Sequence, residues 1–128
     1  MNVLLDTQLL LWAAGQPDRL TTRAIAILEA EESVPHFSVA SLWEVVIKTG
    51  LGRDDFRVDP SALRRNLLDN GYRELTISSA HILAVAGLTL LHKDPFDRLL
   101  IAQANIEGLT LVTSDSIVAR YSPSIVQV

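Results

Sequence analysis

Short strand-like runs alternate with longer segments of helical period along the chain. Apolar and β-prone residues bounded by turn or cap residues predict strands at residues 3–5, 34–37, 72–77, 109–112 and 125–128. Apolar residues that recur every three to four positions predict helices at residues 7–14, 20–31, 39–48, 60–70, 79–91 and 95–107, with a short helix near Ser116. Helical sequence thus separates each strand from the next.

Cap residues support these boundaries. Asp59-Pro60 and Asp94-Pro95 each place a capping aspartate before a proline at the first helical position, where the missing N–H costs nothing. The alternation predicts βαβ units, a mostly parallel sheet and helices on both faces, built as one α/β domain over residues 1–128. Ligands of such sheets bind beyond the carboxyl ends of the strands, so polar residues there are candidates for function.

Two aspartates come directly after predicted strands. Asp6 follows the apolar run 3–5, and Asp115 follows the strand that leads into Thr113 and Ser114. Both have an alternative structural role, because aspartate caps helices well and a helix N-terminus favours negative charge. Asp6 fits either role equally well, and one side chain can serve both.

A single acid lies within the otherwise apolar segment 39–48. Its polar positions form a narrow strip of Ser41, Glu44 and Lys48. A surface ion pair between Glu44 and Lys48 would stabilise the helix by only roughly 0.2–0.5 kcal/mol. Because nearly all other positions are apolar, we expect this helix to be buried on most sides and Glu44 to point into a cleft.

Asp94 and Asp97 stand on either side of a proline in the motif HKDPFDR, residues 92–98. Asp94 is expected to cap the helix that begins at the proline. Asp97 falls at the third helical position, where the capping box favours the longer Glu or Gln. Asp97 is also in line with the apolar stripe of the helix, so it would face the top of the sheet. We therefore interpret Asp94 as structural and Asp97 as chemical.

The four acids Asp6, Glu44, Asp97 and Asp115 are thus expected at one edge of the sheet. Ionised carboxylates repel by roughly 4 kcal/mol per pair at 4 Å with an effective dielectric near 20, so such a cluster needs cations. Carboxylate oxygens suit Mg²⁺ or Mn²⁺, whereas zinc does not fit a chain with no cysteine and three scattered histidines. Metal held by carboxylates at a sheet edge indicates phosphate-ester chemistry.

Composition limits the function further. The absence of cysteine excludes disulfides and thiol chemistry. The net charge of −4 argues against nucleic-acid binding, yet nine of the eleven basic residues are arginine, and a bound cation would reverse the charge at a cluster of acids.

The histidines, His36, His81 and His92, have no serine or cysteine partner at a recognisable spacing and are interpreted as ordinary. Since neither a signal peptide nor a membrane-spanning apolar stretch is recognisable, we expect a cytoplasmic protein.

Together these motifs resemble those of PIN-domain ribonucleases, in particular VapC-like toxins of bacterial toxin–antitoxin pairs. The resemblance covers essentially the whole chain and rests on VLLDT (3–7), SLWE with Lys48 and GLG (41–52), DPFDRLLIA (94–102) and TSD (113–115). It implies an acidic metal site at Asp6, Glu44, Asp97 and Asp115. Close relatives usually have Asp-Thr-His where this chain has Asp6-Thr7-Gln8, a difference that affects a secondary contact and not the metal site.

The resemblance also implies a parallel sheet of strand order 3-2-1-4-5, a homodimer, and an antitoxin encoded beside the toxin. The implied activity is that of a Mg²⁺- or Mn²⁺-dependent endoribonuclease whose products carry 5′-phosphate and 3′-hydroxyl ends. Five residues are candidates for supporting roles, the hydroxyl residues toward water or phosphate and the basic residues toward carboxylates or phosphate: Thr7, Thr113, Ser114, Lys48 and Arg98. The two basic residues have the alternative of simple pairing with Glu44 and Asp94.

Other classes of protein also place acids after parallel strands. A signalling receiver domain has paired acids after its first strand, whereas Asp6 stands alone, and a haloacid-dehalogenase-like phosphatase needs a second aspartate where this chain has Gln8. The alternative that stays open is a non-catalytic interaction module of the same fold, whose acids serve metal-dependent stability. The sequence does not identify the RNA substrate, because shape and loop sequence decide such recognition.

Overall fold

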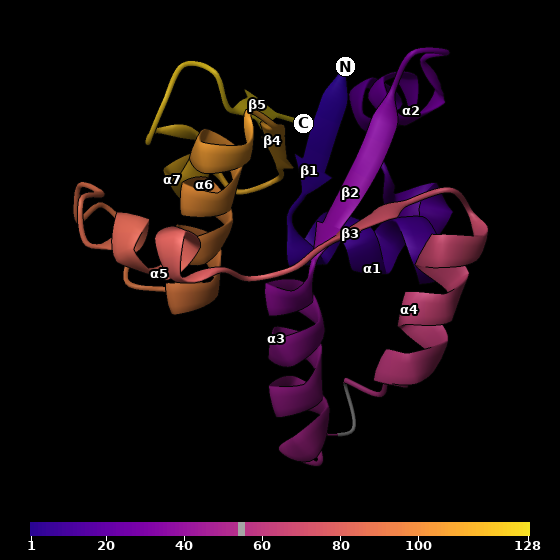
Figure 1. Cartoon of the computed structure of the whole chain (residues 1–128). Helices are drawn as coiled ribbons and strands as arrows, with labels where there is room; N and C mark the ends of the chain where they lie inside the picture. The colour runs from indigo at the N-terminus through magenta and orange to yellow at the C-terminus, as the bar shows by residue number, and fades with distance from the viewer. Residues whose placement is uncertain (54–55) are drawn as a thin grey trace.

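Five parallel strands form the central sheet of the computed structural model, which describes residues 1–53 and 56–128 (Figure 1). The strands are β1 (Asn2–Leu5), β2 (Val34–Ser38), β3 (Arg73–Leu75), β4 (Thr110–Thr113) and β5 (Val126–Gln127). Their order is β3-β2-β1-β4-β5, and each neighbouring pair is parallel. The predicted α/β class and the strand order 3-2-1-4-5 are therefore confirmed.

Helices connect the strands and cover both faces of the sheet. They are α1 (Thr7–Gly15), the 3₁₀ helix η1 (Pro17–Arg19), α2 (Thr22–Glu29), α3 (Val39–Gly50), α4 (Pro60–Asp69), α5 (Ser79–Val85), α6 (Pro95–Glu107) and α7 (Ser116–Ala119). Figure 1 shows α1 and α4 on one side of the sheet and α5, α6 and α7 on the other. The predicted caps are present, since the side chains of Asp59 and Asp94 accept backbone hydrogen bonds from the first turns of α4 and α6.

Strand β1 contributes to two apolar layers because successive residues of a strand point to opposite faces. Val3 and Leu5 pack with residues of α1 and α4, whereas Leu4 packs with residues of α6 on the other face. All three side chains are completely buried. This central position fixes the end of β1, and with it the residue that follows.

The register of β1 and β4 brings the ends of both strands to the same edge. Leu5 is paired with Val112, and the backbone N–H of Asp6 donates to the carbonyl of Val112 at 3.1 Å. Asp6 therefore lies beside Thr113, although more than one hundred residues separate them in sequence. The candidate site is built at this edge.

Helix α5 is shorter than the sequence predicts. The helix expected over residues 79–91 ends at Val85. The guanidinium of Arg98 donates to the carbonyl oxygens of Val85, at 3.2 Å, and Thr89, at 3.0 Å. A contact from α6 thus satisfies backbone acceptors at the end of α5, and Gly87 lies just beyond this end.

Helix α3 has an exposed apolar face, so the expectation that it is buried on most sides was wrong. Trp43, Val46, Ile47 and Leu51 expose 57%, 45%, 38% and 64% of their surface. Glu44 is only 6% exposed and lies on the opposite, inward side of the helix. The periodicity of a sequence shows which positions of a helix are apolar. It does not show whether other parts of the same chain pack against them.

No helix in the described ranges is long and apolar enough to cross a membrane.

Candidate active site

A cleft of about 470 Å³ lies beyond the carboxyl ends of β1 and β4. All four predicted acids line it: Asp6, Glu44, Asp97 and Asp115. They come from the end of β1, the middle of α3, the first turn of α6 and the end of β4. Further lining residues include Thr7, Lys48, Ser114 and Asp94, the last of which the sequence suggested to be purely structural.

Asp6 is fixed by donors from two elements. Its Oδ1 accepts from the backbone N–H of Leu9 at 2.9 Å, which caps α1. Its Oδ2 accepts from the Thr113 hydroxyl at 2.6 Å and from the backbone N–H of Ser114 at 3.2 Å. Burial raises the pKa of the Asp6 carboxyl, these hydrogen bonds oppose the rise, and the charge of Asp115 adds to it. Asp6 is therefore a helix cap and a cleft residue at once.

The hydroxyl groups beside Asp6 connect the segments that carry the acids. Thr7 Oγ1 donates to Ser41 Oγ at 2.8 Å, which joins the start of α1 to α3. Thr113 Oγ1, the donor to Asp6, also accepts from the backbone N–H of Asp115 at 3.0 Å. Both threonine hydroxyl protons are thus engaged within the protein.

Glu44 has one paired and one unpaired oxygen. Its Oε2 forms an ion pair with Lys48 Nζ at 2.8 Å, as their spacing on the helix predicted. Its Oε1 is buried and has no hydrogen-bond partner in the described part of the chain. A buried acceptor left unsatisfied costs on the order of 1–3 kcal/mol, so this atom is suited to a ligand that supplies positive charge.

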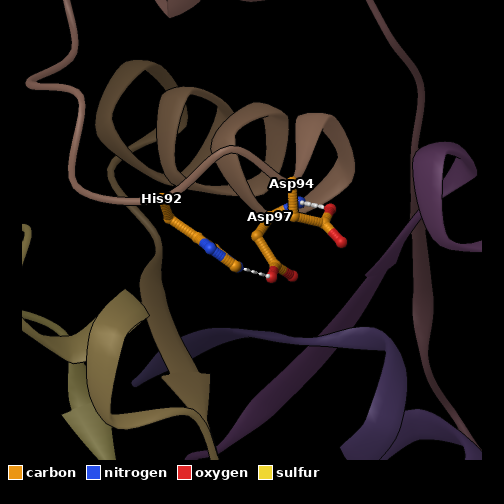
Figure 2. Close-up of side chains that lie close together, drawn as sticks. All are labelled: His92, Asp94 and Asp97. Atoms are coloured by element: carbon orange, nitrogen blue, oxygen red, sulfur yellow. Dashed lines mark hydrogen bonds and ion pairs between the residues drawn. The ribbon is translucent and has the colours of Figure 1, made fainter.

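Asp97 lies between a histidine and a second acid (Figure 2). Its Oδ2 is 2.8 Å from Nε2 of His92, the residue that begins the HKDPFDR motif. Asp94 Oδ1 accepts from the backbone N–H groups of Phe96 and Asp97 at 2.9 and 3.0 Å, as expected for a cap. The predicted capping function of Asp94 is present, but its position in the cleft shows that it is not only a cap.

The surroundings of Asp97 disfavour its charged form. Burial raises the pKa of its carboxyl to about 6, and the negative charges of Asp94 and Glu44 contribute to the rise. The hydrogen bond and the charge of His92 act in the opposite direction. Near neutral pH the Asp97 carboxylate therefore remains electrostatically unfavourable in the absence of a cation.

Asp115 is the N-cap of α7. Its Oδ1 accepts from the backbone N–H groups of Ile117 and Val118 at 2.7 and 3.3 Å. Its Oδ2 lies 4.0 Å from His92 Nε2. Oδ1 thus caps α7, while Oδ2 lies near the His92 imidazole, which contacts Asp97.

Arg98 occupies a different place from the one expected. Besides the carbonyl oxygens of Val85 and Thr89, its guanidinium donates to the hydroxyl of Tyr121 at 3.2 Å. Arg98 is not among the described residues that line the cleft. It therefore fixes the segment between α5 and α6 instead of pairing with Asp94 or facing a phosphate.

The sequence interpretation treated all three histidines as ordinary, and His92 is where it missed a residue of the site. His81, in contrast, is almost fully buried, and its Nδ1 accepts from the backbone N–H of Ser78 in a capping box at the start of α5. Its Nε2–H therefore donates to Glu107 Oε2 at 2.9 Å. His36 contacts the backbone carbonyl of Val34. The only sequence signal for His92 was its place two residues before Asp94.

The donor set fits a divalent cation that prefers oxygen. Five carboxylates of the described residues line one cleft, and Glu44 Oε1 lacks a partner among these residues. One ligand atom from each of His92, Asp94 and Asp97 lies within 4.8 Å of the others. Mg²⁺ and Mn²⁺ bind such groups, and their charge would relieve the repulsion between the carboxylates.

A larger hollow of about 670 Å³ lies next to the cleft and shares Gln8, Leu11 and Phe56 with it. It is bordered by α1 and α4, and Trp12 contributes a ring over which Arg19 lies at 5.7 Å. The indole Nε1 of Trp12 is buried and has no partner within the described residues. None of the four clustered acids lines this hollow, so it is suited to a partly apolar ligand and not to a metal.

A model of the PIN domain family matches residues 3–122. The chain therefore belongs to the PIN domain family, which confirms the family resemblance seen in the sequence. A search among curated proteins by sequence gave no match.

Several solved structures of toxin–antitoxin systems have a similar fold. The alignment with VapBC2 from Rickettsia felis, bound to a DNA fragment from its promoter, has a TM-score of 0.69 at 18% identity and covers 100% of this chain and 98% of that chain. A toxin–antitoxin complex from Klebsiella pneumoniae has a TM-score of 0.66 at 19% identity, with 98% and 96% covered. VapBC-1 from nontypeable Haemophilus influenzae has a TM-score of 0.62 at 15% identity, with 100% and 97% covered. At these identities the similarity establishes a common fold.

Proposed function

We propose that the protein is a metal-dependent endoribonuclease that acts as the toxin of a toxin–antitoxin pair. The observation that carries the proposal is the convergence of Asp6, Glu44, Asp97 and Asp115 in one cleft, with the buried Glu44 Oε1 left without a partner among the described residues. Membership of the PIN domain family and the fold shared with toxin–antitoxin proteins support it.

In this proposal the four acids hold one or two Mg²⁺ or Mn²⁺ ions. When bound, the ion supplies charge that stabilises the scissile phosphate and lowers the pKa of the attacking water. The chain's own residues fix the ligands: Thr113 and the N–H of Ser114 orient Asp6, and Lys48 holds one oxygen of Glu44. Lys48, whose side chain is 46% exposed, also provides positive charge toward an RNA phosphate at the cleft.

We further propose an antitoxin as the protein partner. The three similar structures named above are all of toxin–antitoxin systems. The hollow beside α1 and α4 is lined by apolar residues such as Leu11, Trp12 and Phe56 together with polar ones, which suits an extended, partly apolar segment. Because this hollow shares three lining residues with the cleft, a segment bound there would also restrict access to the acids.

A homodimer in the cytoplasm completes the proposal. The exposed apolar face of α3, formed by Trp43, Val46, Ile47 and Leu51, supports self-association, because patches of large exposed apolar residues mark interaction surfaces. The sequence also offers the segment 52–64 as a candidate for the dimer surface, and residues 54–55 of this segment lie outside the described residues.

A non-catalytic interaction module of the same fold remains the second candidate, favoured by the structural use of cleft acids as caps of α1, α6 and α7.

An RNA cleavage assay distinguishes the nuclease from the interaction module. Purified protein, Glu44→Gln and Asp69→Asn are incubated with total RNA and with Mg²⁺ or Mn²⁺. We expect Glu44→Gln to lower cleavage by about 100-fold or more, because the variant loses a carboxylate that is proposed to hold the divalent cation. Asp69→Asn removes the same charge from an exposed position of α4 and is expected to leave cleavage unchanged.

Metal-dependent melting without cleavage of any RNA by the wild type would favour the interaction module. Equal activity in wild type and Glu44→Gln would contradict the assigned site.

A further inference from the structure

His92 lies directly behind the acids. Its Nε2 is 2.8 Å from Asp97 Oδ2 and 4.0 Å from Asp115 Oδ2, and its side chain is 22% exposed. Among the described residues His92 does not line the cleft, whereas Asp97 and Asp115 do. A group bound in the cleft would therefore meet the imidazole through the carboxylates.

The direction of the hydrogen bond follows from its acceptor. An ionised carboxylate only accepts, so His92 Nε2–H donates to Asp97 Oδ2 when Asp97 is charged. This contact occupies one oxygen of Asp97, Oδ2, and leaves Oδ1 without a hydrogen bond to His92 or Asp94 (Figure 2). Hydrogen bonds of this kind orient the carboxylates that bind metal ions.

The backbone of His92 is held from two other elements. Tyr121, which follows α7, accepts hydrogen bonds at its hydroxyl from the backbone N–H groups of Leu91 and His92, at 3.3 and 2.9 Å. Arg98 of α6 donates to the same hydroxyl and to the carbonyl of Thr89. The segment that carries the imidazole is therefore fixed although it is not helical.

We propose that His92 is a positioning residue that orients the Asp97 carboxylate toward a divalent cation, and that Tyr121 and Arg98 hold it in place. This inference rests on the proposed function, since it concerns the same metal. It assigns the HKDPFDR motif three tasks: His92 orients, Asp94 caps and Asp97 binds.

The test is the affinity of purified protein for Mn²⁺, measured by calorimetry for wild type, His92→Gln and His92→Phe. Phenylalanine keeps a ring of similar size without a donor, whereas the glutamine amide can place an N–H near the position of Nε2. We expect His92→Phe to bind Mn²⁺ about 10–100-fold more weakly and His92→Gln to bind within a few-fold of wild type. His36→Phe, which removes a histidine of β2 outside the cleft, is expected to bind like wild type.

Two further measurements separate positioning from a general loss of structure. Tyr121→Phe keeps the imidazole and removes the hydroxyl that holds its backbone, so it is expected to weaken Mn²⁺ binding in the same direction as His92→Phe. Pulsed electron paramagnetic resonance of Mn²⁺-loaded wild type is expected to show no directly bound nitrogen, since Nε2 is engaged with Asp97. Circular dichroism without metal confirms that each variant is folded.

Each contrary result has a distinct meaning. Unchanged Mn²⁺ affinity in both His92→Phe and Tyr121→Phe would overturn the positioning role and leave the proposed function intact. An equal loss in His92→Gln and His92→Phe, with a nitrogen signal from bound Mn²⁺, would replace positioning by direct ligation. A wild type that binds neither Mn²⁺ nor Mg²⁺ would overturn the proposed function and this inference together.

Discussion

The carboxyl group of Asp97 is partly withdrawn from water and lies near Asp94 and Glu44, and its pKa is raised from 3.8 to about 6. Between these two pH values the folded chain keeps a proton that the unfolded chain has lost. By linkage, the contribution of Asp97 to the stability of the metal-free protein falls as pH rises through this window. Above pH 6 the full cost of the charged group is present.

Replacing Asp97 by asparagine is therefore expected to stabilise the metal-free protein at pH 7.5. A rise of about two pKa units corresponds to roughly 1–3 kcal/mol, and the amide of the Asp97→Asn variant does not titrate. Urea unfolding in the presence of a chelator, at pH 7.5 and at pH 4, measures the gain, which should disappear at the lower pH. The same variant should lose the stabilisation that Mg²⁺ or Mn²⁺ gives the wild type. A destabilised variant at pH 7.5 would show that Asp97 is not under electrostatic strain.

At the residue level, the sequence predicted that the four acids lie together, as they do around the cleft, but it did not indicate the contact of His92 with Asp97. Asp6 and Asp115 follow apolar strands, and Asp97 lies on the apolar stripe of α6, so local patterns were enough. The contact between His92 and Asp97 depends on Tyr121, which lies almost thirty residues further along the chain and holds the His92 backbone. Nothing within the motif itself indicates this distant hydrogen bond.

Helix α6 begins with a residue that has two functions. Asp94 Oδ1 caps the first turn, while the charge of Asp94 raises the pKa of Asp97 one turn later. An acid is favourable at a helix N-terminus and unfavourable beside other acids, and here both effects act on one group.

Substitutions at Asp94 can separate these effects. Asn caps as well as Asp but carries no charge, so Asp94→Asn is expected to keep α6 intact and to lower the pKa of Asp97 below its wild-type value of about 6. Asp94→Ala also lowers it but loses the cap, which costs about 1 kcal/mol of stability. Carbon-13 NMR titration of the carboxyl groups and urea unfolding measure the two quantities. An unchanged Asp97 pKa in both variants would show that Asp94 does not act on it.

At the level of elements, the sequence predicted the order of strands and helices well and their ends less well. The alternation of short apolar runs with helical periods is a local property, and it was enough for the α/β class. Beyond the end of α5, backbone carbonyls bond with Arg98 of another helix, and the apolar face of α3 is not covered by the described part of the chain. Both are tertiary facts that a one-dimensional pattern does not contain.

The whole molecule presents a large apolar surface on α3 opposite the side that carries Glu44. We expect the wild type to sediment with a mass near twice 14.1 kDa and Trp43→Glu to sediment as a monomer, because a charge at a buried dimer contact is unfavourable. Leu68→Glu introduces the same charge at an exposed apolar position of α4, so it serves as the matched control and should remain dimeric. A wild type that is monomeric at all concentrations, or a dimeric Trp43→Glu, would exclude this surface as the dimer contact.

The pairing of β1 with β4 has a consequence for how the protein is made. Strand β1 leaves the ribosome before β4, but the hydroxyl and the backbone N–H that orient Asp6 belong to residues 113 and 114, and Asp115 follows directly. A nascent or truncated chain that lacks residues 110–115 has neither the strand that aligns Asp6 nor the fourth acid. For the nuclease proposed above, the acidic site would therefore assemble only after residues 110–115 have left the ribosome, late in the translation of its messenger RNA.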